Sequence, residues 1–283
     1  KKRHINSFNY MGNQLSKKTM NKGLLSRLVI HEILLTLKKN LYTYEDVFTK
    51  KIKEYGLGKV EKKFIHNVTL TSLRNNFIIK RIINTYSNKR KLTTNQYLIL
   101  LSGINQIVFL NIKEYAVIFT MVELSKVKGF ESDPSLTNAI LRKVVENKND
   151  LKLKKNNFEL LPNWFKLNVS DWNDDTKKIF LDSVRLQPEL NIVFKKEEDF
   201  KKFKIEGVNT SLKSISLKSF ENIERLPDYK KGTWWVQDYS AMLPVSLLDN
   251  ISNKRIIDMC SAPGGKAFQI LSQNENLIMY EIN

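Results

Sequence analysis

The chain has 283 residues, a formal net charge of +18 and a pI of about 9.7. This charge makes a nucleic acid the expected partner. Hydrophobic residues make up 42% of the chain, enough for the cores of about two or three domains. The single cysteine excludes a disulfide scaffold and a multi-cysteine zinc site, and it fits a reducing compartment such as the cytoplasm. The three histidines are widely spread and suggest no metal site, and no apolar run reaches the ~18 residues that a membrane helix needs.

The first 150 residues are predicted to be a basic arm followed by helices. Residues 1–22 contain six basic residues and no acidic one, and we interpret them as a flexible arm or as a leader without a role. Apolar residues then recur at helical spacing to about Val145. The first helix places Leu25, Leu28, Val29 and Ile33 on one face, with Arg27 elsewhere. A second periodic segment covers 64–86.

Two further segments complete this helical region. The threonines at 93 and 94 are typical of a helix start, and residues 97–110 are so apolar that we expect a central helix there. Ser135, after Pro134, opens a last helix. The sequence therefore predicts an all-α bundle. In this bundle Lys89-Arg90-Lys91 lies between two helices and is a candidate contact for RNA phosphate, with a solvated loop as the alternative. Arg142 is expected to cap a helix C-terminus, with a contact to RNA phosphate as the alternative.

The middle of the chain is predicted to be a linker and a small α/β subdomain. Residues 146–157 are rich in Lys and Asn, as linkers are. Residues 190–194, 214–217 and 234–236 read as strands, with a short helix at about 197–203. Both Trp234 and Trp235 are expected to lie in the core of this subdomain, and Ser240 to cap the helix that follows it.

The sequence Asp-Met-Cys-Ser-Ala-Pro-Gly-Gly-Lys at residues 258–266 lies between a predicted buried parallel strand and a predicted helix. A strand, a glycine turn and a helix present backbone N–H groups to a nucleotide-like ligand, and two glycines let the backbone approach it closely. The next predicted strand ends at Glu281, whose carboxylate suits a ribose diol.

The spacing of this turn separates the common ligands. A phosphate-binding loop needs a glycine where Cys260 stands and Ser or Thr where Ala267 stands. A dinucleotide fingerprint needs three spaced glycines, but only Gly264 and Gly265 are present. An adenosine-type pocket without a phosphate cradle remains, and it suits S-adenosylmethionine. A plain strand-to-helix turn is the alternative.

Residues 232–241 and 257–266, in this order, resemble the bacterial Sun/NOL1/NOP2-type 16S ribosomal RNA cytosine-C5 methyltransferases. Residues 100–107, 116–123 and 137–143 resemble the NusB-like RNA-binding domain of these enzymes, although Lys113-Glu114-Tyr115 stand where a proline is usual. The resemblance implies that S-adenosyl-L-methionine is held by Cys260, Ser261, Ala262, Pro263, Gly264, Gly265, Lys266 and Glu281, the last of which is more often Asp in the family.

The resemblance also implies a multidomain chain: an arm at 1–22, a NusB-like bundle at 23–150, a small α/β subdomain at 158–235, and the first part of a class I, Rossmann-like methyltransferase domain at 236–283. In the family two later cysteines carry the chemistry. Cys260 lies in the cofactor turn and is interpreted as a packing group, so no catalytic residue is assigned. We expect the catalytic cysteines beyond Asn283 and these 283 residues alone to be inactive.

The expected partner is RNA, in particular 16S ribosomal RNA, bound by a monomer. Two alternatives stay open. One is an RNA-binding or antitermination-like module with an inactive methyltransferase remnant, and the other is a class I methyltransferase with another substrate, such as transfer RNA. The sequence does not identify the target nucleotide.

Overall fold

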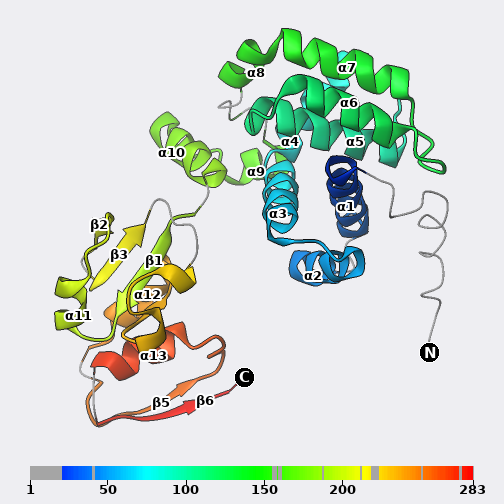
Figure 1. Ribbon diagram of the computed structural model, residues 1–283. Helices are drawn as coiled ribbons and strands as arrows, with labels where there is room; N and C mark the ends of the chain where they lie inside the picture. The colour runs from blue at the N-terminus through cyan, green and yellow to red at the C-terminus, as the bar shows by residue number, and fades with distance from the viewer. Residues whose placement is uncertain are drawn as a thin grey trace, which may run out of the picture. The chain divides into compact units, whose positions relative to one another are not determined.

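The chain divides into two compact units, residues 1–186 and 187–283, each of which is described by itself (Figure 1). The boundary lies inside the 158–235 range predicted from the sequence, and the finer division of the chain into domains remains a proposal. The computed structural model describes residues 21–39, 42–154, 158, 161–186, 188–210, 212–217, 223–249, 251–273 and 276–282. The predicted arm at 1–22 lies outside these residues except for its last two.

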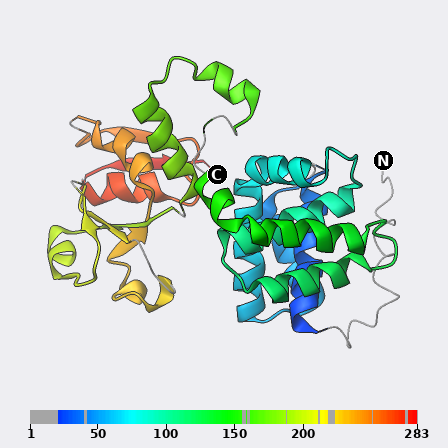
Figure 2. The ribbon, with the colours of Figure 1, turned by 90° about the horizontal axis from the view of Figure 1, so that it is seen from above.

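The first unit is helical, as predicted. Its core is formed by α1 (Lys22–Leu37), α2 (Tyr44–Tyr55), α3 (Lys59–Arg74), α4 (Asn76–Tyr86), α5 (Thr94–Ile104), a π-helical turn (Asn105–Phe109), α6 (Glu114–Ser125) and α7 (Pro134–Glu146). Three further helices follow: α8 (Lys148–Lys154), α9 (Asn163–Asn168) and α10 (Asp174–Arg185). The helices of the bundle lie side by side when the unit is seen from above (Figure 2). No helix among the described residues is long and apolar enough to cross a membrane.

The predicted central helix is α5. Its N-cap is Thr93, whose hydroxyl accepts a hydrogen bond from the Gln96 backbone N–H at 3.1 Å. Eight of its eleven residues are buried, because α1, α4, α6 and α7 all pack against it. The predicted segment 97–110 leaves α-helical geometry at Asn105 and ends in the π-helical turn, which periodicity did not indicate.

The segment 64–86 is two helices and not one. Asn75 interrupts it, and its side-chain amide and its backbone N–H both donate to the Thr71 carbonyl, at 2.9 and 3.1 Å. An asparagine side chain that bonds its own backbone competes with helix continuation. Leu73, before the break, and Phe77, after it, are 41% and 44% exposed, so neither belongs to the buried apolar face that helical spacing predicts for this segment.

Arg27 is buried and does not lie on the polar face predicted for it. Its Nη1 donates to the Gly23 carbonyl at 3.0 Å, and its guanidinium lies 5.3 Å from the centre of the Phe64 ring. Burial lowers the pKa of Arg27 to about 10. The apolar stem and the flat guanidinium allow this residue to fill core space between α1 and α3.

The predicted linker is partly helical, because α8 occupies 148–154. Lys148 anchors the start of α8 by an ion pair of 2.7 Å with Glu114. Residues 155–157 lie outside the described part of the chain. Beyond them, α9 and α10 pack around stacked rings of Phe165 and Phe180, whose centres are 4.9 Å apart.

The second unit begins with a four-stranded antiparallel sheet of order β2-β3-β1-β4, in which β1, β3 and β4 are the predicted strands. Its core contains Ile192, Phe194, Ile215, Leu217 and Trp234. Trp235, on the other face of β4, is only half-buried. The elements are β1 (Leu190–Phe194), α11 (Glu197–Lys202), β2 (Val208–Asn209), β3 (Ser214–Leu217), two 3₁₀ turns (Ile223–Arg225 and Tyr229–Lys231) and β4 (Trp234–Val236).

The last elements of the second unit carry the predicted cofactor turn. They are α12 (Tyr239–Ser246), β5 (Arg255–Asp258), α13 (Gly265–Gln273) and β6 (Ile278–Glu281). Strands β5 and β6 pair in parallel, as predicted. The expectation that β5 is buried is wrong, because the described part of this sheet has only these two strands and Ile257 is 62% exposed.

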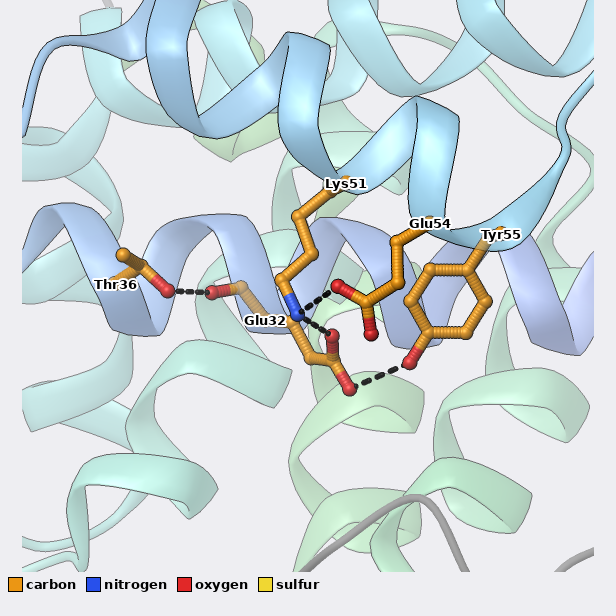
Figure 3. A network of polar contacts seen from close by, with 5 residues as sticks. All are labelled: Glu32, Thr36, Lys51, Glu54 and Tyr55. Carbon is orange, nitrogen blue, oxygen red and sulfur yellow. Dashed lines mark hydrogen bonds and ion pairs between the residues drawn. The ribbon is translucent and has the colours of Figure 1, made fainter. Parts of the chain in front are cut away.

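A charged network joins α1 to α2 (Figure 3). Glu32 accepts from Lys51 Nζ at 2.6 Å and from the Tyr55 hydroxyl at 2.8 Å, and Glu54 lies 3.1 Å from the same ammonium. The Lys51 side chain is 14% exposed. Its burial lowers the pKa of Lys51, but hydrogen bonds and charge attraction from Glu32 and Glu54 outweigh this effect, and the pKa is raised.

The Glu32→Gln variant should lose about 1–2 kcal/mol of unfolding free energy, because Lys51 then keeps only Glu54 as a countercharge. Urea unfolding followed by circular dichroism measures this loss. Since the folded-state pKa of Lys51 is raised, the contribution is present below its unfolded pKa and disappears as the pH rises through the folded value. Glu146→Gln, at an exposed position, is the matched control and should change stability by less than about 0.5 kcal/mol. Equal effects of the two variants would contradict the role of the network.

Candidate cofactor site

The predicted cofactor turn starts at the carboxyl end of β5 and is tied to the end of β6. The Asp258 carboxylate accepts from the Cys260 backbone N–H at 3.2 Å. The backbone N–H of Ile282 donates to the Asp258 carbonyl at 3.0 Å, and that of Ser261 donates to the Ile282 carbonyl at 3.4 Å. Asp258 and Glu281 are register partners in the parallel pair. The structure thus brings the turn and the predicted diol-binding carboxylate to one edge of the sheet.

Only one of the two glycines is required by the backbone. Gly264 has φ +100°, and a Cβ there would lie 3.2 Å from the Phe268 ring. The Gly264 carbonyl also accepts the first hydrogen bond of α13, from the Phe268 N–H at 2.8 Å. Gly265 lies at the start of α13, and a Cβ there would meet the Gln237 side chain at an ordinary 3.4 Å. Gly264 therefore shapes the turn.

The turn residues differ in exposure. Ser261 and Gly264 are buried, and Gly265 is half-buried. The remaining residues assigned to the cofactor are exposed, and they are Cys260, Ala262, Pro263, Lys266 and Glu281. Within the described parts of the chain, no group of three His, Cys, Asp or Glu side chains is placed to hold a metal ion.

A pair of buried amides fixes α13 behind the turn. The Gln237 Nε2 donates to Gln269 Oε1 at 3.0 Å, and the Gln269 Nε2 donates to the Met242 carbonyl at 3.1 Å. The Gln237 Oε1 accepts from the Trp235 indole N–H at 2.8 Å. This amide clamp, formed by Gln237 and Gln269, links the end of β4, α12 and α13.

Sequence reasoning missed Gln269, because a glutamine in an amphipathic helix is expected to face water. Gln237 belongs to the 232–241 segment that carries the resemblance, and its side chain lies against Gly265. The cap of α12 is Asp238, whose carboxylate accepts from the Ser240 N–H at 2.8 Å. Ser240 is thus in the first turn of α12 and is not its cap.

Cys260 is a free, exposed thiol at the start of the turn. The Cys260→Ser variant should keep the unfolding free energy of the chain within about 0.5 kcal/mol, because the side chain is not part of a core. If it packs against a bound cofactor, affinity for S-adenosylmethionine should fall by about 1 kcal/mol in equilibrium dialysis. A covalent complex between Cys260 and RNA that contains 5-fluorocytosine would show instead that the thiol is a nucleophile.

The candidate phosphate contacts lie on the surface of the first unit. Lys89, Arg90 and Lys91 are exposed in the connection between α4 and α5. Arg142 is exposed in α7, where its Nε donates to Asn138 Oδ1 at 3.2 Å. The expectation that Arg142 caps this helix is wrong, because the last turn is closed by Asn147, whose amide donates to the Lys143 carbonyl at 2.8 Å.

Comparison with known proteins agrees with the resemblance seen in the sequence. Residues 24–146 match the model of the NusB family. A ribosomal RNA small subunit methyltransferase B of Xylella fastidiosa is 26% identical over 191 residues, which are 64% of this chain and 44% of that protein. The transcription antitermination protein NusB of Buchnera aphidicola is 27% identical over 129 residues, 44% of this chain and 89% of that protein.

Two further matches concern a shorter segment and the fold. A mouse 28S rRNA (cytosine-C(5))-methyltransferase is 44% identical over 55 residues, 19% of this chain and 7% of that protein. The crystal structure of PH0851 superposes with a TM-score of 0.56 at 14% identity and covers 94% of this chain and 64% of that one, which shows a common fold. The chain spans less than half the length of the small subunit methyltransferases B that it matches. Residues 24–146 are thus a NusB-family domain, in a chain that is similar to the ribosomal RNA small subunit methyltransferases B over 64% of its residues.

Proposed function

We propose that this chain takes part in S-adenosylmethionine-dependent methylation of cytosine C5 in 16S ribosomal RNA, in the cytoplasm. Its NusB-family domain contributes RNA binding, and residues 258–266 with Glu281 contribute part of the cofactor pocket. The observation that carries the proposal is the turn at Gly264, which follows a parallel strand and lies beside the carboxyl end of the next one. The names of the relatives support the methylation of ribosomal RNA.

The residues present fit the adenosine part of S-adenosylmethionine. Gly264 has no Cβ that would crowd the Phe268 ring in the turn, and five of the eight assigned residues are exposed to solvent, where a ligand can reach them. Glu281 would accept hydrogen bonds from the ribose hydroxyls, and the turn would offer backbone N–H groups. S-adenosylmethionine, when bound, supplies the methyl group. The turn would hold and orient it, and the amide clamp fixes α13 behind the turn.

RNA binding should depend steeply on salt. Residues 1–40 contain nine basic residues and one acidic residue, a net charge of +8, and the whole chain carries +18. Contacts between these basic residues and RNA phosphates release counterions, so the logarithm of the affinity should fall with the logarithm of the salt concentration with a slope of roughly several units. Fluorescence anisotropy with a fragment of 16S ribosomal RNA measures the slope. A flat dependence, or an absence of binding at low salt, would contradict the proposal.

A second function is favoured by the match to an antitermination protein, which covers 89% of that relative. In this alternative the chain is an RNA-binding module, and the turn after β5 binds no cofactor. The two functions differ in one observable property, the binding of S-adenosylmethionine at residues 258–266. Retained RNA binding without that cofactor would favour the module.

A further inference from the structure

A cavity of about 530 Å³ lies in the first unit, where the end of α1 meets α4, α5 and the connection between them. This α4–α5 pocket is defined by its cationic side chains Lys38, Lys80 and Arg90 and by the Tyr97 ring. Its volume is within the range of about 300–1,000 Å³ that is usual for small-ligand sites. It belongs to one unit only, and it is separate from the cofactor turn.

The deep side of the pocket is apolar. It is lined by Leu34, Ile83, Leu98 and Leu101, all of them core residues at most 2–3% exposed. Beside them Leu37 and Leu92 are only partly buried and Leu73 is exposed, and these three present apolar surface to the pocket. Unpaired nucleotides commonly bury the face of a base against apolar and aromatic side chains of this kind.

The Tyr97 ring is held in place beside this floor. Its hydroxyl donates to Asn76 Oδ1 at 2.6 Å, and burial raises the pKa of Tyr97 to about 12, so the hydroxyl remains a donor at neutral pH. Lys38 Nζ lies 5.7 Å from the ring centre and donates to Thr94 Oγ1 at 3.2 Å. An aromatic wall is therefore fixed next to a cation.

The rim of the pocket is positive. Lys38, Lys80 and Arg90 are exposed and reach it from α1, α4 and the connection before α5. No Asp or Glu lines the pocket, and neither Lys80 nor Arg90 makes an ion pair with a described residue. Their charges are available to a ligand, and three cations around an apolar floor are complementary to a phosphate group attached to a base.

We propose that the α4–α5 pocket binds one unpaired nucleotide of an RNA strand. The base lies on the apolar floor beside Tyr97, and Lys80 and Arg90 bind the flanking phosphates. This assignment rests on the proposed RNA-binding function and adds to it a preference for single-stranded RNA. It also gives a role to Arg90, the middle residue of the basic run 89–91.

Fluorescence anisotropy of the 283-residue chain with a labelled 12-nucleotide single-stranded RNA, and with the duplex of the same sequence, tests the assignment. The pocket variant is Lys80→Glu/Arg90→Glu. The control variant, Lys62→Glu/Lys128→Glu, makes the same change of charge at exposed positions of the same unit outside the pocket. Since all four side chains are exposed, both variants should melt at the temperature of the wild type.

The wild type should bind the single strand more tightly than the duplex. The pocket variant should lose about 10-fold or more in affinity for the single strand and should lose this preference, whereas the control should lose at most about 3-fold. Equal losses in the two variants, or a preference for single strands that survives in the pocket variant, would overturn the pocket while leaving RNA binding intact. A wild-type chain that binds neither RNA would overturn the proposed function as well.

Discussion

The Gly264→Val variant is expected to lose measurable binding of S-adenosylmethionine. Gly264 has φ +100°, which a β-branched residue adopts only under strain, and a Cβ would lie 3.2 Å from the Phe268 ring. Strain and crowding together should cost about 3 kcal/mol or more. The turn would relax by moving Phe268 and the start of α13, and the cofactor would lose its backbone donors. Equilibrium dialysis with labelled S-adenosylmethionine measures the loss.

Gly265→Ala is the matched control for the fold. Its Cβ would lie 3.4 Å from Gln237, an ordinary contact, and alanine favours the helix that starts there. Hydrogen exchange at the amides of α13 should therefore stay slow in Gly265→Ala and become faster in Gly264→Val. A Gly264→Val variant that exchanges and binds like the wild type would show that the turn does not depend on its glycine.

The Gln237→Leu variant is expected to destabilise the second unit by about 2–4 kcal/mol. The substitution leaves Gln269 Oε1 without its 3.0 Å donor and the Trp235 indole without its 2.8 Å acceptor, in a region where Gln269 is buried. A buried polar group that loses its partner costs about 1–3 kcal/mol. Hydrogen exchange of β4, α12 and α13 amides reports the loss in this unit.

A double-mutant cycle isolates the amide clamp. Replacing both Gln237 and Gln269 by leucine removes the donor and the acceptor together, which costs less than leaving one of them unpaired. The double variant should therefore be more stable than the sum of the single losses predicts, by about 1 kcal/mol or more. Strict additivity would show that the two amides act independently.

The sequence predicted those helices and strands whose formation depends on residues that are close together in the chain. The helix start at the threonines 93 and 94 and the β-branched strands 190–194 and 214–217 are found in the structure. The last helix of the bundle is also found, although it starts at Pro134 with Asp133 as its cap and not at Ser135. The strand, glycine turn and helix around residues 258–266 could be predicted because their order and spacing are contiguous in the chain.

Features that depend on partners distant in sequence could not be predicted. The burial of Arg27 requires Phe64, and the burial of Gln269 requires Gln237 and Met242. The α4–α5 pocket joins residues from 34 to 101, of which the sequence identified only the basic run near Arg90. The different roles of Gly264 and Gly265 could not be predicted either, because they depend on the backbone angles and the sequence shows only two adjacent glycines.

The central claim is that the turn after β5 binds S-adenosylmethionine. Titration of the ¹⁵N-labelled chain with S-adenosylmethionine, followed by amide ¹H–¹⁵N spectra, tests it most directly, because each backbone N–H of the turn reports separately and weak binding is detected. We expect saturable shifts at Asp258, Cys260, Ser261 and Gly264 to Lys266 and at Glu281, with the amides of the helical unit unchanged. If the chemical shifts of these amides stay unchanged, whether or not other amides shift, the claim is contradicted.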